Sequence, residues 1–196
     1  MMKKRMTAGM LATLMAAVLP VSACAAQNSA PQLNTAEHMQ YMNGYTDSTF
    51  RPDASITRAE ASKLLTSLLV DWGEHRDYLF SDVSVSAWYA NAVCQMINFG
   101  LVNGYTDGTF KPEQPVTREQ LAAILSRYAS LHGVAVDGAA GDLPADASVS
   151  NWAKKDAAWA YAEGILTYAQ TMGATKNATR AEVASAIYTY LTETAK

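Results

Sequence analysis

The chain has 196 residues, a net charge of −3 at neutral pH, 49% hydrophobic residues and two cysteines. This acidic balance argues against a general nucleic-acid-binding protein, which needs a basic surface. Two cysteines are too few for a disulfide framework.

The first residues have the composition of a bacterial export signal. Lys3, Lys4 and Arg5 form a basic start, and residues 8–19 form an uncharged apolar run. This run is too short to span a bilayer, and small residues follow it, as in a cleaved signal peptide. We therefore predict that residues 1–23 are removed and that the mature protein reaches the cell envelope. Losing the three positive charges leaves a net charge of −6.

Two cleavage routes are open. Residues 21–24, Val-Ser-Ala-Cys, resemble a lipobox, in which Cys24 is acylated and becomes the new N-terminus. Residues 23–25, Ala-Cys-Ala, also satisfy the small-x-small rule of ordinary signal peptidase, which would leave Cys24 behind. On either route no second cysteine is left to form a disulfide with Cys94, and its apolar neighbours predict a small buried hydrophobe.

A ten-residue string occurs twice, 60 positions apart. The pattern Asn-Gly-Tyr-Thr-Asp-x-Thr-Phe-(Arg/Lys)-Pro stands at residues 43–52 and 103–112. A Thr-Arg pair follows each copy, at residues 57–58 and 117–118, and a third pair lies at 179–180. Self-similarity at a fixed period predicts an array of one supersecondary unit.

The rest of the chain divides into a flexible leader and three units. The boundaries are 24–34 for the leader, 35–70 for unit one, 79–131 for unit two and 142–191 for unit three. A linker rich in Gly and Ala, residues 133–141, separates the last two units. Unit two is complete. Unit one has almost no first helix, only about residues 36–42, and unit three has a shorter, divergent loop.

Unit two sets the pattern for the others. Its first helix begins at about residue 87, carries Trp88 and other apolar residues on one side, and ends at Gly100. In the loop that follows, residues 107–108, Asp-Gly, predict a tight turn with positive φ. We expect Phe110, just after this turn, to fill the core.

The second helix of each unit has one buried face. Apolar residues recur at positions i, i+3, i+4 and i+7, which is typical of an amphipathic helix. The three stripes start at Ala61, Leu121 and Val183. Three helix-loop-helix units of this kind predict a mostly α fold with no substantial sheet.

Each second helix opens with a capping box, and an arginine follows the cap. The boxes are Thr57 with Glu60, Thr117 with Gln120 and Thr179 with Glu182. The helix dipole disfavours a cation at the first helical position, here Arg58, Arg118 and Arg180, by about 0.3–1 kcal/mol each. An anion bound between free N–H groups and the guanidinium would offset this. Alternatively, each arginine pairs with an acid of a neighbouring unit, such as Asp82 or Asp146.

These strings resemble the S-layer homology domain. Unit two carries that family's signature in order, unit one matches in its second half, and unit three keeps only a few landmarks. The matching stretches are Phe80-x-Asp82-Val83, Trp88-Tyr89, residues 100–112 and Thr117-Arg118-Glu119 in unit two, and Asp146, Trp152, Gly164 and Thr179-Arg180-Ala181-Glu182 in unit three.

The resemblance implies a fold and a function. Members of the family carry three tandem copies that form a three-pronged helical bundle around a pseudo-threefold axis. They hold secreted proteins on the cell wall or S-layer by binding a peptidoglycan-linked secondary cell-wall polysaccharide, commonly a pyruvylated and therefore anionic one. The ligand contacts that it implies are Arg58, Arg118, Arg180, Asp82, Trp88, Asp146 and Trp152, with Arg118 expected to contribute most because only unit two has the full motif.

Other functions find less support in the sequence. A calcium loop counted from Asn103 would need a glutamate at position twelve, where Gln114 stands. No catalytic or metal-binding motif is present, so we expect no enzyme activity, metal or cofactor. Because no catalytic or adhesive segment follows unit three, an alternative stays open: a protein-interaction or membrane-to-wall tethering module whose grooves hold a partner chain.

Overall fold

The computed structural model describes residues 42–68, 80–136 and 143–194, and this part of the chain is helical without β-strands. The mostly α fold is therefore confirmed. The helices are α1 (Arg58–Ser67), α2 (Ala90–Asn98), α3 (Arg118–Leu131), η2 (Asn151–Ala153), α4 (Lys154–Ala162), α5 (Tyr168–Thr171), α6 (Arg180–Thr189) and η3 (Tyr190–Thr194). The predicted signal peptide, Cys24, the leader 24–34 and the start of unit one lie outside the described residues.

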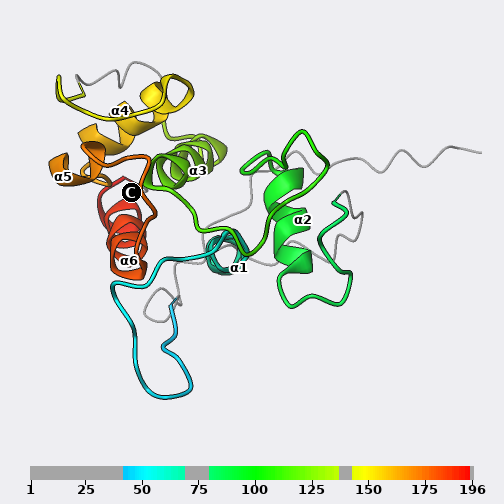
Figure 1. Cartoon of the computed structure of the whole chain (residues 1–196). Coiled ribbons are helices and arrows are strands. Elements are labelled where there is room, and N and C mark those ends of the chain that lie inside the picture. Colours follow the sequence, from blue (N-terminus) through cyan, green and yellow to red (C-terminus); the bar gives the residue numbers. More distant parts are fainter. Residues whose placement is uncertain (1–41, 69–79, 137–142, 195–196) are drawn as a thin grey trace, which may run out of the picture.

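The second helices of the three units, α1, α3 and α6, surround a common core (Figure 1). The first helix of unit two, α2, packs on α1 of unit one, and the first helix of unit three, α4, packs on α3 of unit two. Each of these first helices therefore covers the second helix of the unit before it, which joins consecutive units.

A closed ring of backbone hydrogen bonds ties the three units together. The N–H of Ile56 donates to the carbonyl of Ala178 (3.3 Å), Ala178 donates to Val116 (2.8 Å), and Val116 donates to Ile56 (3.0 Å). Each of these residues directly precedes the cap of a second helix. The ring relates the units in cyclic order, while the three-pronged outline stays a prediction.

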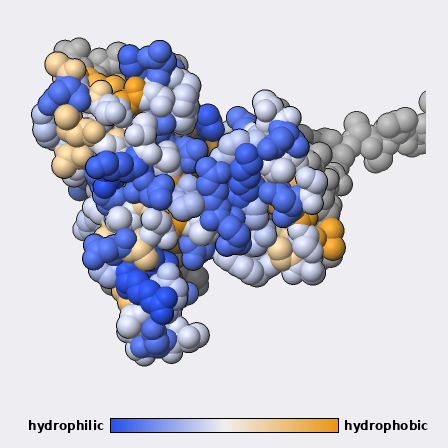
Figure 2. All heavy atoms as spheres, in the orientation of Figure 1, coloured by the Kyte–Doolittle hydropathy of each residue, from blue (hydrophilic) through white to orange (hydrophobic). Residues whose placement is uncertain are grey.

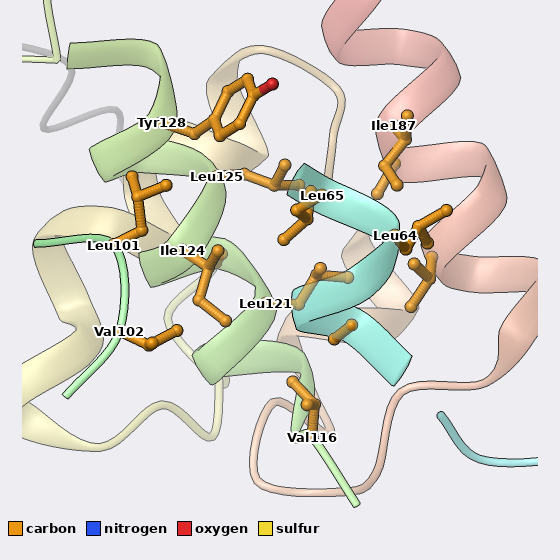
Figure 3. Packing of buried hydrophobic residues seen from close by; sticks show 14 of the residues in the cluster. Leu64, Leu65, Leu101, Val102, Val116, Leu121, Ile124, Leu125, Tyr128 and Ile187 are labelled. Atoms are coloured by element: carbon orange, nitrogen blue, oxygen red, sulfur yellow. The ribbon is translucent and has the colours of Figure 1, made fainter. Parts of the chain in front are cut away.

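The core inside this ring is apolar and comes from all three units. Leu65 of α1 lies between Leu125 of α3 and Ile187 of α6, and each of the three is no more than 1% exposed (Figure 3). One helical turn further, Leu68, Tyr128 and Tyr190 occupy matching positions and are also buried. Burial raises the pKa of both tyrosines well above its usual range, so their hydroxyls stay protonated.

The local predictions hold where the structure describes them. All three capping boxes form, with the threonine side chain and the Glu or Gln side chain each accepting a backbone N–H. Gly100 and Gly108 have φ angles of 66° and 77°, the left-handed region in which glycine avoids a Cβ clash. Phe110 is fully buried and Cys94 is buried, as expected.

Two local predictions were wrong. Helix α2 begins at Ala90 rather than near residue 87, so Trp88 precedes it and is 60% exposed instead of facing the core. In unit three the segment expected to be a loop contains a short helix, α5, with a capping box of its own at Thr167. The first difference arises at a helix end, where sequence periodicity gives the weakest signal, and the second is a helix of four residues, too short to show a period.

Truncation of the shared core should affect all three units at once. Leu125→Ala removes a fully buried side chain and should lower the free energy of unfolding by about 2–5 kcal/mol. Lys63→Ala, at an exposed position of α1, is the control and should change it little. Chemical denaturation followed by circular dichroism should show one shifted transition. Two transitions, only one of them shifted, would contradict a shared core.

Candidate functional site

Arg58 and Arg180 clasp the loop of a neighbouring unit. The Arg58 guanidinium donates through Nε to the Phe110 carbonyl (2.8 Å) and through Nη2 to the Asn103 carbonyl (3.0 Å). Arg180 makes the same two bonds, both 2.9 Å, to Phe50 and Asn43 of unit one. The two arginines are only 8% and 7% exposed.

Aromatic rings complete both clasps. The Arg58 guanidinium carbon lies 4.4 Å from the ring centre of Phe110 and 5.2 Å from that of Tyr105. Arg180 stands over Tyr45 and Phe50 in the same way. Burial lowers the pKa of Arg58 from its ordinary value, but an arginine stays charged at neutral pH. The repeated Tyr and Phe of the ten-residue string therefore make cation–π contacts with the arginine of the preceding unit in the ring.

Arg118 is held differently, by an ion pair. Its Nη2 lies 2.6 Å from Oε1 of Glu182, its Nε contacts both carboxylate oxygens, and its Nη1 donates to the Gly173 carbonyl. Both side chains are mostly buried. Burial alone would raise the pKa of Glu182, but hydrogen bonds from Arg118 and from the Thr179 N–H outweigh it and lower the pKa.

The helix starts offer no free N–H groups to an anion. In α1 the N–H of Arg58 donates to Gln114 and that of Ala59 to Pro112, while the capping box satisfies the next one. The starts of α3 and α6 are satisfied in the same way, by carbonyls at residues 176 and 174 and at residues 54 and 52. The premise of open anion-binding helix ends was therefore wrong, because the neighbouring loop already occupies them.

Among the described residues, the alternative of an internal ion pair holds for Arg118 and not for Arg58 or Arg180. The acid of the pair is Glu182, the capping residue of α6, and not one of the predicted aspartates. Arg58 and Arg180 are held by carbonyls and aromatic rings instead. The helix dipole disfavours an arginine at the helix start. Groups of the next unit in the ring, which bind the arginine side chain, compensate for this.

The two aspartates occupy equivalent places with different partners. Both carboxylate oxygens of Asp82 accept backbone N–H groups, from Phe110 (2.7 Å) and Lys111 (2.8 Å). Lys111 has a φ of 56°, an uncommon angle for a residue with a side chain, and Arg51, its equivalent in unit one, has a φ of 53°. Asp146 is exposed and accepts a bond from the hydroxyl of Tyr168 (2.7 Å), which raises the pKa of that tyrosine.

Trp88 and Trp152, two of the predicted residues, are exposed. They are 60% and 55% exposed and precede the first helices of units two and three. The Trp88 ring meets Tyr89 edge-on, with ring centres 5.2 Å apart. Burial, with the charges of Glu113 and Asp82 nearby, raises the pKa of Tyr89. Trp88 is therefore next to a residue, Tyr89, that lies near Asp82. Asp82 binds the N–H of Phe110, and Arg58 of unit one binds the carbonyl of Phe110, so this is the junction of units one and two.

Sequence reasoning missed a second inter-unit bond made by the helix starts. Glu119, the residue after Arg118, is 6% exposed and accepts bonds from the N–H and the hydroxyl of Ser150, both 2.9 Å. Ser150 directly precedes η2, so this carboxylate fixes the start of the segment that leads into α4 of unit three. Units one and three have alanine at this position. The glutamate in unit two was therefore the sequence signal that could have indicated this contact.

Comparison with known families finds the S-layer homology domain at residues 22–62 and 79–122. These ranges contain the clasped loop strings and the capping boxes of units one and two. The chain carries the S-layer homology repeat. Repeats of this family anchor proteins to the cell wall and are non-catalytic modules.

Three relatives of the chain are named as cell-surface, anchoring or surface-layer proteins. It is 39% identical over 95 residues to cell surface glycoprotein 1 of Acetivibrio thermocellus, covering 47% of this chain and 4% of that protein. It is 29% identical to a cellulosome-anchoring protein of the same organism, covering 67% of this chain and 30% of that protein. It is 31% identical to a surface-layer 125 kDa protein of Lysinibacillus sphaericus, covering 88% and 15%.

The chain thus spans less than a third of the length of these relatives. This chain and these relatives share the S-layer homology repeat. Across residues 42–68, 80–136 and 143–194, no helix is long and apolar enough to cross a membrane.

The Arg118–Glu182 pair predicts acid sensitivity. Because the folded-state pKa of Glu182 lies below its ordinary value of 4.5, the pair stabilises the fold above that pH. This stability is lost as the pH falls through the lowered pKa. Glu182→Gln should lower the free energy of unfolding by about 1–3 kcal/mol at neutral pH. It should also flatten the acid limb of the stability curve.

The matched control is Glu60→Gln, at the same position of α1. Gln120 shows that glutamine serves the capping box, so both variants keep their caps. Thermal unfolding between pH 3 and 7 compares them. Equal losses in the two variants would show that capping, and not the ion pair, accounts for the effect.

Proposed function

We propose that the protein is a non-catalytic cell-envelope module that binds an anionic secondary cell-wall polysaccharide, such as a pyruvylated one. The observation that carries the proposal is the match of two S-layer homology repeats, together with an exposed tryptophan beside an inter-unit junction. A flat aromatic ring with its face in water can bind the apolar face of a sugar ring.

The junction of units one and two supports this proposal best. Trp88 supplies an exposed ring, Asp82 orders the loop beside it, and Arg58 places a positive charge beneath the loop. The amine of Lys111 lies over Tyr105 and 3.2 Å from Asp107, which adds a surface cation on the same loop. One polymer segment would contact the ring with a sugar and the cations with its acidic group.

The other two junctions are expected to contribute less. Trp152 and Asp146 belong to unit three, whose Gly173 and Glu182 hold Arg118, but Glu182 neutralises that arginine, so an anion gains less there. We therefore expect Arg118 to act mainly in holding units two and three together, rather than as the leading ligand contact. At the third junction, Arg180 has its clasp but no described tryptophan beside it.

The face of the molecule in Figure 2 is compatible with a hydrated polymer. Figure 2 shows a face that is mostly hydrophilic, with apolar residues in small separate patches. A partner protein held by hydrophobic burial would require a larger continuous apolar area. The protein-interaction alternative is therefore the second candidate, and binding to purified walls stripped of protein tests it.

Loss of the exposed ring should weaken wall binding without unfolding the protein. Trp88→Ala should reduce the affinity for purified cell walls by about 2 kcal/mol, the size typical of an exposed aromatic anchor. Its melting temperature should change little because the ring is mostly in water. Met172→Ala, at another partly exposed apolar residue, is the control. Co-sedimentation with walls, before and after chemical removal of pyruvate, gives both affinities.

Unchanged wall binding by Trp88→Ala would contradict this site. Binding that survives removal of pyruvate would contradict the anionic ligand but leave wall binding in place. Binding only to walls that keep their proteins would favour the protein-interaction alternative.

A membrane-to-wall tether is a further form of the same proposal, and the lipobox-like residues 21–24 favour it. If Cys24 is acylated, a leader of the ten residues 25–34 would reach about 15–20 Å from the lipid as a random coil. The units would then bind only polymer close to the membrane. Cys24→Ala should release the protein from membranes while wall binding persists. Mass spectrometry of the mature N-terminus decides, since an unmodified start at Ala26 would exclude the tether.

A further inference from the structure

Glu119 is a buried carboxylate in the first turn of α3, where the helix dipole favours a negative charge. Its two oxygens accept the N–H and the hydroxyl of Ser150, each over 2.9 Å. An ionised carboxylate makes stronger hydrogen bonds than a neutral acceptor, and these bonds replace part of the solvation that burial removes. Glu119 therefore binds the chain of unit three at one defined point.

Ser150 stands at the start of the turn that contains Trp152. Its carbonyl accepts the N–H of Ala153 (2.9 Å), which closes the turn η2, and α4 follows without a break. Ala153 is fully buried. The backbone of Trp152 is thus held on both sides, by Glu119 through Ser150 and by the core through Ala153, while Trp152 itself is 55% exposed.

Unit two offers the matched comparison. The residue of α1 that corresponds to Glu119 is Ala59, whose side chain has no hydrogen-bond acceptor. Ser86 stands two residues before Trp88, and its hydroxyl forms a hydrogen bond of 3.0 Å with the hydroxyl of Ser84. The serine before this tryptophan therefore has a partner in its own turn, in place of a carboxylate from the neighbouring unit.

The two turns differ at the residues next to this serine. In unit three the helical winding begins at Asn151, one residue before Trp152. In unit two it begins at Ala90, two residues after Trp88. The tryptophan that follows the Glu119 contact is therefore part of a helical turn, and the tryptophan that lacks such a contact precedes its helix.

We propose that Glu119 is a positioning residue, which holds Trp152 in place for the wall polymer without contacting the polymer itself. This proposal rests on the proposed function, in which an exposed tryptophan binds a sugar ring. A ring on an ordered backbone loses less conformational freedom when a ligand binds, so the same contact gives a higher affinity. The junction of units two and three, where Glu182 neutralises Arg118, would then owe its share of binding to the fixed ring.

Amide hydrogen exchange tests the local ordering without cell walls. Glu119→Ala gives α3 the alanine that α1 and α6 have at this position, so the variant should fold. We expect the N–H groups of Ser150 and Ala153 to exchange at least about tenfold faster than in the wild-type protein, because the turn opens locally. Glu119→Gln is the conservative variant and should keep most of the protection, since its amide can accept the N–H and donate to the hydroxyl.

The N–H of Val183 is the internal reference, because it donates to Thr179 in the first turn of α6. Unchanged exchange at Ser150 and Ala153 in Glu119→Ala would overturn the proposal. Equal acceleration at Val183 would also overturn it, since Glu119 would then stabilise the whole fold and not one turn.

Wall binding tests whether the ordering serves the ligand. Glu119→Ala should weaken binding to purified walls about threefold, and it should cause no further loss in a Trp152→Ala background. An equal loss in both backgrounds would overturn the proposal, because Glu119 would then act through another part of the molecule. Unchanged binding by Trp152→Ala would overturn it as well. Failure of the wild-type protein to bind walls would contradict the proposed function, and with it this proposal, while the exchange rates would still report the local ordering.

Discussion

The structure depends on an exchange of helix caps around the ring of three units. The first N–H groups of each second helix donate to backbone carbonyls of the next unit in the ring. An isolated helix would leave these groups to water or to side chains. Here the loop of the neighbouring unit satisfies them, and the arginine that begins the helix clasps the same loop. The repeated Thr-Arg pair thus serves mainly to hold neighbouring units together.

This arrangement decides how the predicted ligand residues divide. Arg58, Arg118 and Arg180 are turned inward and engaged with protein groups, whereas Trp88 and Trp152 stand in water. The arginines hold the junctions in shape, and the exposed rings and ordered loops are left for a ligand. The charge of Arg58 is not neutralised by a described ion pair, while that of Arg118 is. The three junctions of a repeat protein therefore differ in electrostatics even though their backbones match.

Local features of the fold were predictable from the sequence and long-range ones were not. The capping boxes, the glycine turns and the apolar stripes depend on residues a few positions apart, so the pattern contains them. The acceptors of Arg58 and Arg180 are backbone carbonyls 45 to 137 positions away, and any residue type supplies a carbonyl. The exposure of Trp88 depends on where α2 begins, which the loop before it sets. The Glu119–Ser150 hydrogen bonds were visible in the sequence only as a glutamate at a position where the other two units have alanine.

The ring of caps has a direction, because the helix start of unit one donates to unit two, that of unit two donates to unit three, and that of unit three donates to unit one. Such head-to-tail contacts close only when the number of units matches the rotation between them. A chain that ended after unit two would leave the start of α3 without its carbonyls and the loop of unit one without its arginine. These two unsatisfied edges are complementary, so two shortened chains would fit each other end to end. The same bonds that make one chain a closed ring would then make incomplete chains polymerise.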